Sequence, residues 1–336
     1  MSARASILPV FVPHIGCPHR CVFCNQDRIA GSAERVCGDT VRALLASVPA
    51  ADVKRELAFY GGSFTSIPEQ LQLELLSAAQ EGILSGKIRS IRLSTRPDAI
   101  DAAVLDRLKR FGVETVELGA QSLDDEVLRL SGRGHTAEDV RRSARLVKDA
   151  GFRLILQMMT GLPGDSVERS LATARGIVAL QPDGVRIYPT VVVRDTELVE
   201  LWKSGLYREH TVEDAVDVCA KLLPLFEAAG IPVIRLGLNP TEELSGGAAV
   251  AGAYHPALGE LVRSRILLDR ARELLVGAEP GSRAELRVRP QLLSQMLGQN
   301  RRNVSTLIEE FRLAELRVLP DPSADAEIKA VFIEKT

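Results

Sequence analysis

Residues 16–26 read Gly-Cys-Pro-His-Arg-Cys-Val-Phe-Cys-Asn-Gln and decide how the rest of the chain is interpreted. Cys17, Cys21 and Cys24 stand in a C-x3-C-x2-C spacing directly after the apolar run 7–12, which reads as a strand. Three thiolates this close together suit an iron–sulfur cube, which normally takes four cysteine ligands. With three ligands, one iron stays open for another group. The stretch therefore predicts a cluster site.

Zinc and inert thiols are the alternatives for this triplet. Structural zinc prefers four ligands in a closed tetrahedron, so it fits only if His14 or His19 contributes. Cys37 and Cys219 stand alone in the sequence and are most simply small buried hydrophobic residues.

The composition is that of an ordinary globular protein, with 46% hydrophobic and 26% charged residues among 336. A formal net charge of -2 gives no general attraction to nucleic acid, so such a partner would need a local basic patch. Five cysteines, an odd number, argue against a secreted disulfide scaffold and for a reducing, cytoplasmic compartment. No run approaches ~18 uninterrupted apolar residues, so we expect no membrane partner.

Strands and helices alternate through the first 240 residues. Apolar runs read as strands at 7–12, 56–60, 88–94, 113–118, 152–159, 184–188 and 231–237. Helical periodicity covers 41–48, 99–111, 124–130, 136–150, 167–180 and 212–229. This order implies a parallel sheet with right-handed crossovers, either doubly wound or barrel-like. Polar and Gly-rich residues after each strand favour the barrel, so the expected fold class is α/β, a partial TIM-like (β/α)6 barrel.

The pattern changes near residue 240. Pro, Gly and small residues mark 239–255 as a linker or loop. Beyond it we expect helices near 258–275 and 303–316 and short strands near 285–288 and 329–333. The chain is thus divided into a core barrel, residues 1–240, and a small C-terminal α/β domain of unknown role, residues 241–336.

Polar residues at and after the strands are candidates for ligand contacts. Gly61-Gly62-Ser63 lets the backbone approach a ligand, although such a pair is more often only a turn. Gln121 can offer a donor and an acceptor to a ligand, or satisfy a loop backbone. Arg133 either binds a carboxylate through two hydrogen bonds from its guanidinium group or is a solvated loop cation. Gln157 stands in an apolar strand and needs a partner, which a core hydrogen bond or a cofactor would supply.

Together these features resemble the radical S-adenosylmethionine (SAM) superfamily, and within it the Elongator catalytic subunit family and its shorter bacterial relatives. The matching runs are Thr95-Arg-Pro-Asp98, Gln121-Ser122, Arg133-Gly-His-Thr136, Gly161-Leu-Pro-Gly164, Ile187-Tyr-Pro-Thr-Val191 and Glu200-Leu-Trp-Lys-Ser-Gly205. The resemblance covers about residues 7–240. The oxygen-independent coproporphyrinogen oxidases are more distantly similar.

The resemblance implies two cofactors, a [4Fe-4S] cluster on Cys17, Cys21 and Cys24 and SAM on the open iron. The reduced cluster would cleave SAM to methionine and a 5′-deoxyadenosyl radical, which abstracts hydrogen from a substrate. The SAM contacts implied are Gly61, Gly62, Ser63, Ser94, Gln121, Arg133, Gln157 and Leu162. Ser94 stands where both families usually carry a Glu, and Gln157 stands where the porphyrin branch has an Asp.

Partners and substrate are less determined. The resemblance implies a low-potential electron donor such as flavodoxin or ferredoxin. Five arginines face one acid, Glu285, and can hold RNA phosphates, so an RNA nucleoside is one substrate class, although a solvated face is the plainer interpretation. These arginines are Arg283, Arg287, Arg289, Arg301 and Arg302. His135, Tyr188, Arg194 and Arg235 either line the open end of the barrel or are structural.

Two other classes of function stay open. One is a non-catalytic iron–sulfur protein for electron transfer or sensing, which would not bind SAM. The other is an RNA-binding module with a vestigial radical SAM core, whose salt-dependent RNA binding would survive Cys→Ala changes. The Elongator subunit continues into an acetyltransferase domain, whereas this chain ends in a different tail. Its acetyl-coenzyme A chemistry is therefore not expected here.

Overall fold

The computed structural model describes residues 6–12, 17, 19–25, 36–49, 55–239, 244–323 and 327–333, and it folds into two compact units. One unit comprises Met1–Thr211 and Leu222–Tyr254, and the other Val212–Lys221 and His255–Thr336. The division of the chain into domains at residue 240 stays a prediction.

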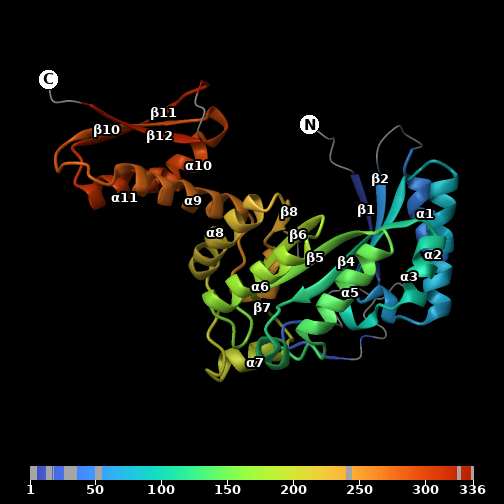
Figure 1. Ribbon diagram of the computed structural model, residues 1–336. Coiled ribbons are helices and arrows are strands. Elements are labelled where there is room, and N and C mark those ends of the chain that lie inside the picture. The colour runs from blue at the N-terminus through green and yellow to red at the C-terminus, as the bar shows by residue number, and fades with distance from the viewer. Residues whose placement is uncertain are drawn as a thin grey trace. The chain divides into compact units, whose positions relative to one another are not determined.

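A seven-stranded parallel sheet in the order β1-β2-β3-β4-β5-β6-β8 forms the centre of the first unit (Figure 1). Its strands are β1 Ser6–Val12, β2 Arg55–Gly61, β3 Ser90–Thr95, β4 Val113–Gln121, β5 Arg153–Thr160, β6 Gly184–Pro189 and β8 Val233–Leu236. The α/β, partial-barrel class expected from the alternation is confirmed, with seven parallel strands.

Helices follow the strands largely as predicted, although the helix at Glu197–Lys203 was not expected, and in Figure 1 α5 and α6 run along β4 and β5. They are α1 Gly38–Ser47, α2 Glu69–Leu84, α3 Ala102–Arg110, α4 Asp125–Leu130, α5 Ala137–Asp149, α6 Val167–Leu180, α7 Glu197–Lys203 and α8 Val212–Ala228. Short helical turns lie at Phe64–Ser66, Pro97–Ala99 and Leu244–Ala248. Side-chain caps fix where two of these helices begin. Thr136 and Asp139 form a capping box at the N-terminus of α5, and Ser166 caps the N-terminus of α6.

Side chains alternate between the two faces of each core strand. One face is apolar and buried, as in β3, where Ile91 and Leu93 are fully buried. The opposite face carries polar, charged and aromatic side chains at neighbouring register positions. We call it the polar face, and its residues include Phe11, Glu56, Tyr60, Arg92, Ser94, Glu117, Gln157, Arg186, Tyr188 and Arg235.

The second unit packs helices against a three-stranded sheet in the order β11-β10-β12. The elements are α9 Leu258–Leu275, β10 Arg283–Val288, α10 Leu293–Leu297, α11 Arg302–Phe311, β11 Glu315–Pro320 and β12 Ile328–Ile333, with short turns at Pro290–Leu292 and Gln299–Arg301. β10 pairs parallel with β11 and antiparallel with β12. Leu267, Leu286 and Leu307 lie in its core.

Two further elements differ from expectation. The helix expected to run to residue 316 ends at Phe311, because Arg312 adopts a left-handed φ of 51° and the chain then forms β11. Leu313 and Leu316 continue a helical spacing by coincidence, since they face the core from a turn and a strand. The expected linker 239–255 contains β9, Ala249–Gly252, which pairs with β7, Val191–Val193; residues 240–243 lie outside the described ranges.

The isolated cysteines also differ from each other. Cys219 is fully buried, as expected for a small hydrophobic residue. Cys37 is only half-buried and occupies the N-cap position of α1, where its sulfur lies 3.6 Å from the Thr40 hydroxyl. None of the helices in the described part of the chain is long and apolar enough to span a bilayer.

Candidate functional site

The cysteine loop follows β1 and is held between two other segments. The amide of Val22 donates to Ser131 O at 3.1 Å, and the carbonyl of Val22 accepts from the Leu198 amide at 2.8 Å. The ring of His19 fills the space that a side chain on Gly134 would need. Backbone contacts therefore set the position of the loop. Cys21 is buried in it, and Cys17 and Cys24 are half-buried.

Two guanidinium groups face the cysteine sulfurs. Arg133 Nη1 lies 3.4 Å from Cys21 Sγ, and Arg96 Nη1 lies 3.9 Å from Cys17 Sγ. Arg96 is aimed by two 2.9 Å hydrogen bonds to the carboxylate of Asp98. A cation beside sulfur stabilises the thiolate, which is the form that binds metal. The three cysteine sulfurs and the two neighbouring arginines therefore suit a metal cluster that is bound by several thiolates.

The three thiols also interact electrostatically with one another. Burial, together with nearby Cys21 and Cys17, raises the pKa of the Cys24 thiol to about 12, while Arg133 acts in the opposite direction. Across the described ranges, no three His, Cys, Asp or Glu side chains surround a point where one metal ion could bind. His14 lies outside those ranges. A cluster differs from a single ion because its ligands bind separate irons.

The glycine turn after β2 lies against the end of β1. Gly61 has a φ of 100°, and a Cβ there would lie 2.7 Å from Val12 O. The Gly62 amide donates to the same carbonyl at 3.0 Å. Ser63 is buried, and its hydroxyl lies 2.9 Å from Thr95 Oγ1 and accepts from the Arg96 amide at 3.1 Å. The turn is therefore braced by β1 and β3, next to the start of the cysteine loop.

Gln121 and Arg133 meet above Gly119, at the end of β4. A Cβ on Gly119 would lie 3.0 Å from Gln121 Nε2 and 3.3 Å from Arg133 Nη2, so the glycine makes room for both. Gln121 has a φ of 63°, at an irregularity in the β4–β5 register. Its Oε1 and the Nε of Arg133 are buried without a hydrogen-bond partner in the described structure. Buried unpaired polar atoms of this kind point to a missing ligand.

Gln157 is held by a carboxylate from the neighbouring strand. Its Nε2 donates to Glu117 Oε2 at 3.0 Å and to Ser94 Oγ at 3.4 Å. A carboxylate only accepts, so Glu117 requires the NH2 end of the Gln157 amide. The carbonyl oxygen of Gln157 is therefore left to accept from another group. Ser94 lies beside Glu117 in the β3–β4 register.

The turn after β5 is covered by residues from a later segment. Gly161 and Gly164 have φ values of 72° and 77°, and Leu162 between them is buried. The Asp165 carboxylate accepts from the Gly161 amide at 2.8 Å, and the Tyr207 hydroxyl donates to Gly161 O at 2.7 Å. The turn and Leu162 are therefore enclosed by contacts from later residues.

Glu117 is the centre of a network on the polar face that sequence reasoning missed. Its side chain is fully buried and accepts from Tyr60 at 3.1 Å, Arg92 at 3.0 Å and Arg186 at 2.8 Å. Burial raises the pKa of this carboxyl, but Arg186 and Arg92 outweigh that effect and hold the pKa below its usual value. The signal available in the sequence was charged residues at alternating positions of apolar strands.

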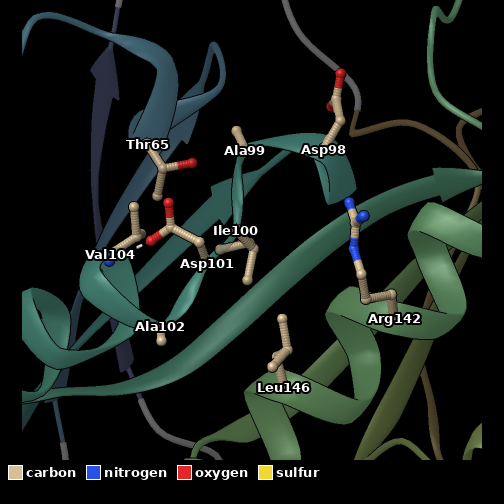
Figure 2. A pocket seen from close by; sticks show the side chains of 9 residues that line it. All are labelled: Thr65, Asp98, Ala99, Ile100, Asp101, Ala102, Val104, Arg142 and Leu146. Carbon is tan, nitrogen blue, oxygen red and sulfur yellow. Dashed lines mark hydrogen bonds between the residues drawn. The ribbon is translucent and has the colours of Figure 1, made fainter.

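A separate pocket of about 540 Å³ opens near α3 and α5 (Figure 2). Asp98 and Arg142 lie on one side of it, and Thr65 and Asp101 on the other. None of the residues expected to bind the cluster or SAM lines this pocket.

Two of the five C-terminal arginines lie close to acids. Arg283 and Arg287 share the exposed face of β10, but Arg287 pairs with Glu285 at 3.2 Å. β11 adds a second acid, because Glu315 lies 3.9 Å from Arg283. Glu285 is the one acid within residues 283–302, and the β10–β11 pairing, which was not predicted, brings in Glu315 from outside that stretch. Arg301 and Arg302 are exposed at the start of α11.

Two family models match this chain in succession. The radical SAM superfamily model matches residues 11–175, and the Radical_SAM C-terminal domain model matches residues 182–267. The cysteine loop, the glycine turn, Gln121, Arg133 and Gln157 all fall within the first match.

Curated relatives of this chain include Elongator subunits and a tRNA acetyltransferase. Human Elongator complex protein 3 is 35% identical over 192 residues, which are 51% of this chain and 35% of that protein. The tRNA uridine(34) acetyltransferase of Methanocaldococcus infernus is 28% identical over 63% of this chain and 48% of its own length. The chain thus spans about a third to a half of these relatives.

The structures agree with this grouping. An N-terminally truncated Elp3 from M. infernus superposes with a TM-score of 0.61 at 25% identity, over 82% of this chain and 66% of that one. Escherichia coli coproporphyrinogen III oxidase shares the fold, with a TM-score of 0.50 at 17% identity over 67% of this chain and 53% of that one. From the two matched models, the cysteine loop and the parallel half-barrel, we conclude that this chain belongs to the radical SAM superfamily, in which a [4Fe-4S] cluster and SAM are the cofactors.

Proposed function

We propose that this protein cleaves SAM reductively and uses the resulting radical to abstract hydrogen from a substrate, with Cys17, Cys21 and Cys24 as the cluster ligands. The observation that carries the proposal is the pair of unpartnered buried atoms, Gln121 Oε1 and Arg133 Nε, beside the cysteine loop. An electron-transfer or sensor protein would need the thiolates but not these two polar atoms.

Different residues of this chain would bind different parts of SAM. The bound cluster and SAM would supply the 5′-deoxyadenosyl radical. The Gly61-Gly62-Ser63 turn offers backbone close to the cysteine loop. Gln121 and Arg133 lie ready to bind the ribose and the carboxylate, and the carbonyl of Gln157 accepts from a hydroxyl or amino group. Ser94 and the backbone at Leu162 complete the set.

The substrate proposed is a nucleoside of RNA. Relatives that cover half of this chain or more include one whose name specifies a tRNA uridine, and the exposed arginines of β10 and α11 can contact phosphates. A low-potential donor such as a flavodoxin or ferredoxin would reduce the cluster. None of the five cysteines, all within the described ranges, is in a disulfide, which suits a reducing cytoplasmic compartment.

The deciding experiment is anaerobic reconstitution with iron and sulfide, reduction, and assay of SAM conversion to 5′-deoxyadenosine, with and without total RNA. We expect turnover in the wild type. Cys21→Ala should lose both the bound iron and the product. Cys37→Ser is the matched control, because it removes a thiol at a helix N-cap, where Ser is a good residue, and should keep both.

The SAM contacts are tested separately by binding. Arg133→Gln should retain the cluster but bind SAM at least about tenfold more weakly, because a charge-assisted hydrogen bond is worth ~1.5–3 kcal/mol. A fully loaded wild-type cluster that binds no SAM would favour the electron-transfer alternative. RNA binding that is unchanged in Cys21→Ala, together with no SAM cleavage under any condition, would favour the vestigial-core alternative.

A further inference from the structure

Arg235 is a cation on the polar face whose charge is not matched by an acid. Its Nε donates to Gly237 O at 3.0 Å and its Nη2 donates to Leu238 O at 3.0 Å. Within the described residues, no carboxylate forms an ion pair with it. By contrast, Arg92 and Arg186 on the same face both pair with Glu117, and Arg92 also pairs with Glu56.

The charge on the polar face is therefore unbalanced. Among the buried and half-buried residues of this face, three arginines, at positions 92, 186 and 235, stand against two glutamates, at positions 56 and 117. Both glutamates are buried and already engaged by Arg92 and Arg186. A half-buried guanidinium that has only carbonyl partners keeps its full positive charge. One anionic group would neutralise this buried part of the face.

Tyr188 provides a hydroxyl beside the unmatched charge. It lies two residues beyond Arg186 on the same face of β6, and Arg186 pairs with Arg235 in the β6–β8 register. Burial raises the pKa of the Tyr188 hydroxyl, while Arg186 and Arg235 both act to lower it, so its oxygen lies within the field of both cations. A protonated Tyr188 can donate a hydrogen bond to an anion.

The same face offers an exposed aromatic surface. Phe11 is 52% exposed, although it lies within β1, and its register partner on β2 is Tyr60. The hydroxyl of Tyr60 accepts from Arg186 Nη2 at 3.0 Å, which links the aromatic side of the face to its cationic side. Gln157, an expected SAM contact, is the β5 register partner of Arg186.

From this arrangement we propose that the polar face binds a molecule carrying a planar ring and one anionic group, with the anion at Arg235 and Tyr188 and the ring against Phe11. This proposal specifies the substrate of the proposed function. It rests on that function only in taking the bound molecule as the target of the radical. Binding itself requires neither electrons nor turnover. The ring and anion can come from a nucleotide of RNA or from a free aromatic acid.

The test is calorimetric titration of the reconstituted, SAM-loaded protein with two pairs of probes. The first pair is uridine 5′-monophosphate and uridine, and the second is benzoate and benzamide. In at least one pair, we expect the anionic member to bind about tenfold or more tightly than its neutral partner, because a charge-assisted hydrogen bond contributes ~1.5–3 kcal/mol. Preference for the first pair identifies a nucleotide, and preference for the second an aromatic acid.

Variants locate the site. Arg235→Gln should reduce affinity for the anionic probe about tenfold, and Arg235→Lys should restore part of it. Arg153→Gln removes an exposed cation of the same face at the start of β5, four residues before Gln157, and should bind like the wild type. Phe11→Ala should weaken the ring-bearing probes and leave inorganic phosphate unaffected. Thermal unfolding of each variant shows whether it is folded.

The proposal is overturned if the neutral and anionic probes bind alike, if none binds, or if folded Arg235→Gln binds as well as the wild type. Failure of the proposed function looks different. It is absence of 5′-deoxyadenosine under every condition, including saturating anionic probe, whereas the affinity difference between Arg235→Gln and the wild type is measured without turnover.

Discussion

Arg186 Nη2 donates a hydrogen bond of 3.0 Å to the hydroxyl of Tyr60, although β6 and β2 are four strand positions apart in the sheet. Neighbouring strands lie ~4.8 Å apart, so four steps in a flat sheet would span about 19 Å. Two side chains of this length cannot meet across that span unless the sheet curls strongly. The polar face is therefore the inside of a partial barrel, and Glu117 lies between the two residues with hydrogen bonds to both.

Glu117→Gln should be strongly destabilising. The change keeps the shape of the side chain but leaves Arg92 and Arg186 buried beside a neutral amide. Removing one partner of a buried ion pair costs ~3–5 kcal/mol, so we expect a loss of that size in the free energy of unfolding by urea. Glu126→Gln, which breaks an exposed pair with Arg129, is the control and should cost under ~1 kcal/mol. Equal losses in the two variants would contradict a structural role for the network.

Stability should fall between about pH 6.5 and pH 4 because of His135. Burial and the nearby Arg133 lower the pKa of His135 to about 4, and its Nε2 donates to Ala120 O at 3.2 Å. The unfolded chain takes up the proton near pH 6.5, before the folded protein does, so stability decreases as the pH falls through this window. The loss is on the order of 3 kcal/mol. Urea unfolding of His135→Gln across this range should show a flatter profile, and parallel profiles would refute the assignment.

Gly119→Ala should weaken SAM binding without loss of the cluster. The φ of Gly119 lies outside the left-handed region, so any residue can adopt its backbone conformation. A methyl group there would lie 3.0 Å from Gln121 Nε2 and 3.3 Å from Arg133 Nη2. Both groups must then move by a few tenths of an ångström, and we expect the affinity for SAM to drop about tenfold, or ~1.4 kcal/mol. Equilibrium dialysis of SAM and iron content are the measurements. Gly259→Ala, with no atom within 4 Å of the new methyl, is the control and should behave as wild type.

Gly161→Ala should be rescued in part by shortening His210. A Cβ on Gly161 would overlap the ring of His210, and the φ of 72° disfavours alanine as well. The Cβ of His210 would itself lie 2.4 Å from the new methyl group, so only His210→Gly removes the overlap. That double variant keeps the backbone strain at residue 161, and unfolding should show a coupling energy of ~0.5–3 kcal/mol. Gly205→Ala, at a φ of 75° with open space around it, measures the strain alone, about 1 kcal/mol. Strict additivity of the two changes would mean that His210 does not cover the turn.

Local sequence predicted most of the fold because its signals act over a few residues. The helix at 258–275 was predicted with the bounds that α9 has, and the alternation predicted the parallel sheet. The strands that were not predicted, β7, β9 and β11, all have distant partners. β7 and β9 pair with each other across some 60 residues, and β11 pairs with β10 about 30 residues earlier, so no short window contains the reason for these strands.

For the site, the sequence by itself determined the cysteine spacing, the glycine turns and the polar positions that mark the superfamily, because these depend on residue type and short spacing. Only the tertiary structure decided which polar groups meet. It placed Arg96 and Arg133 beside the cysteine sulfurs, joined Glu117 to side chains from β2, β3, β5 and β6, and left Arg235 without an acid. These relationships depend on strand order and on the curl of the sheet, which are properties of the whole chain and are not written in any one segment.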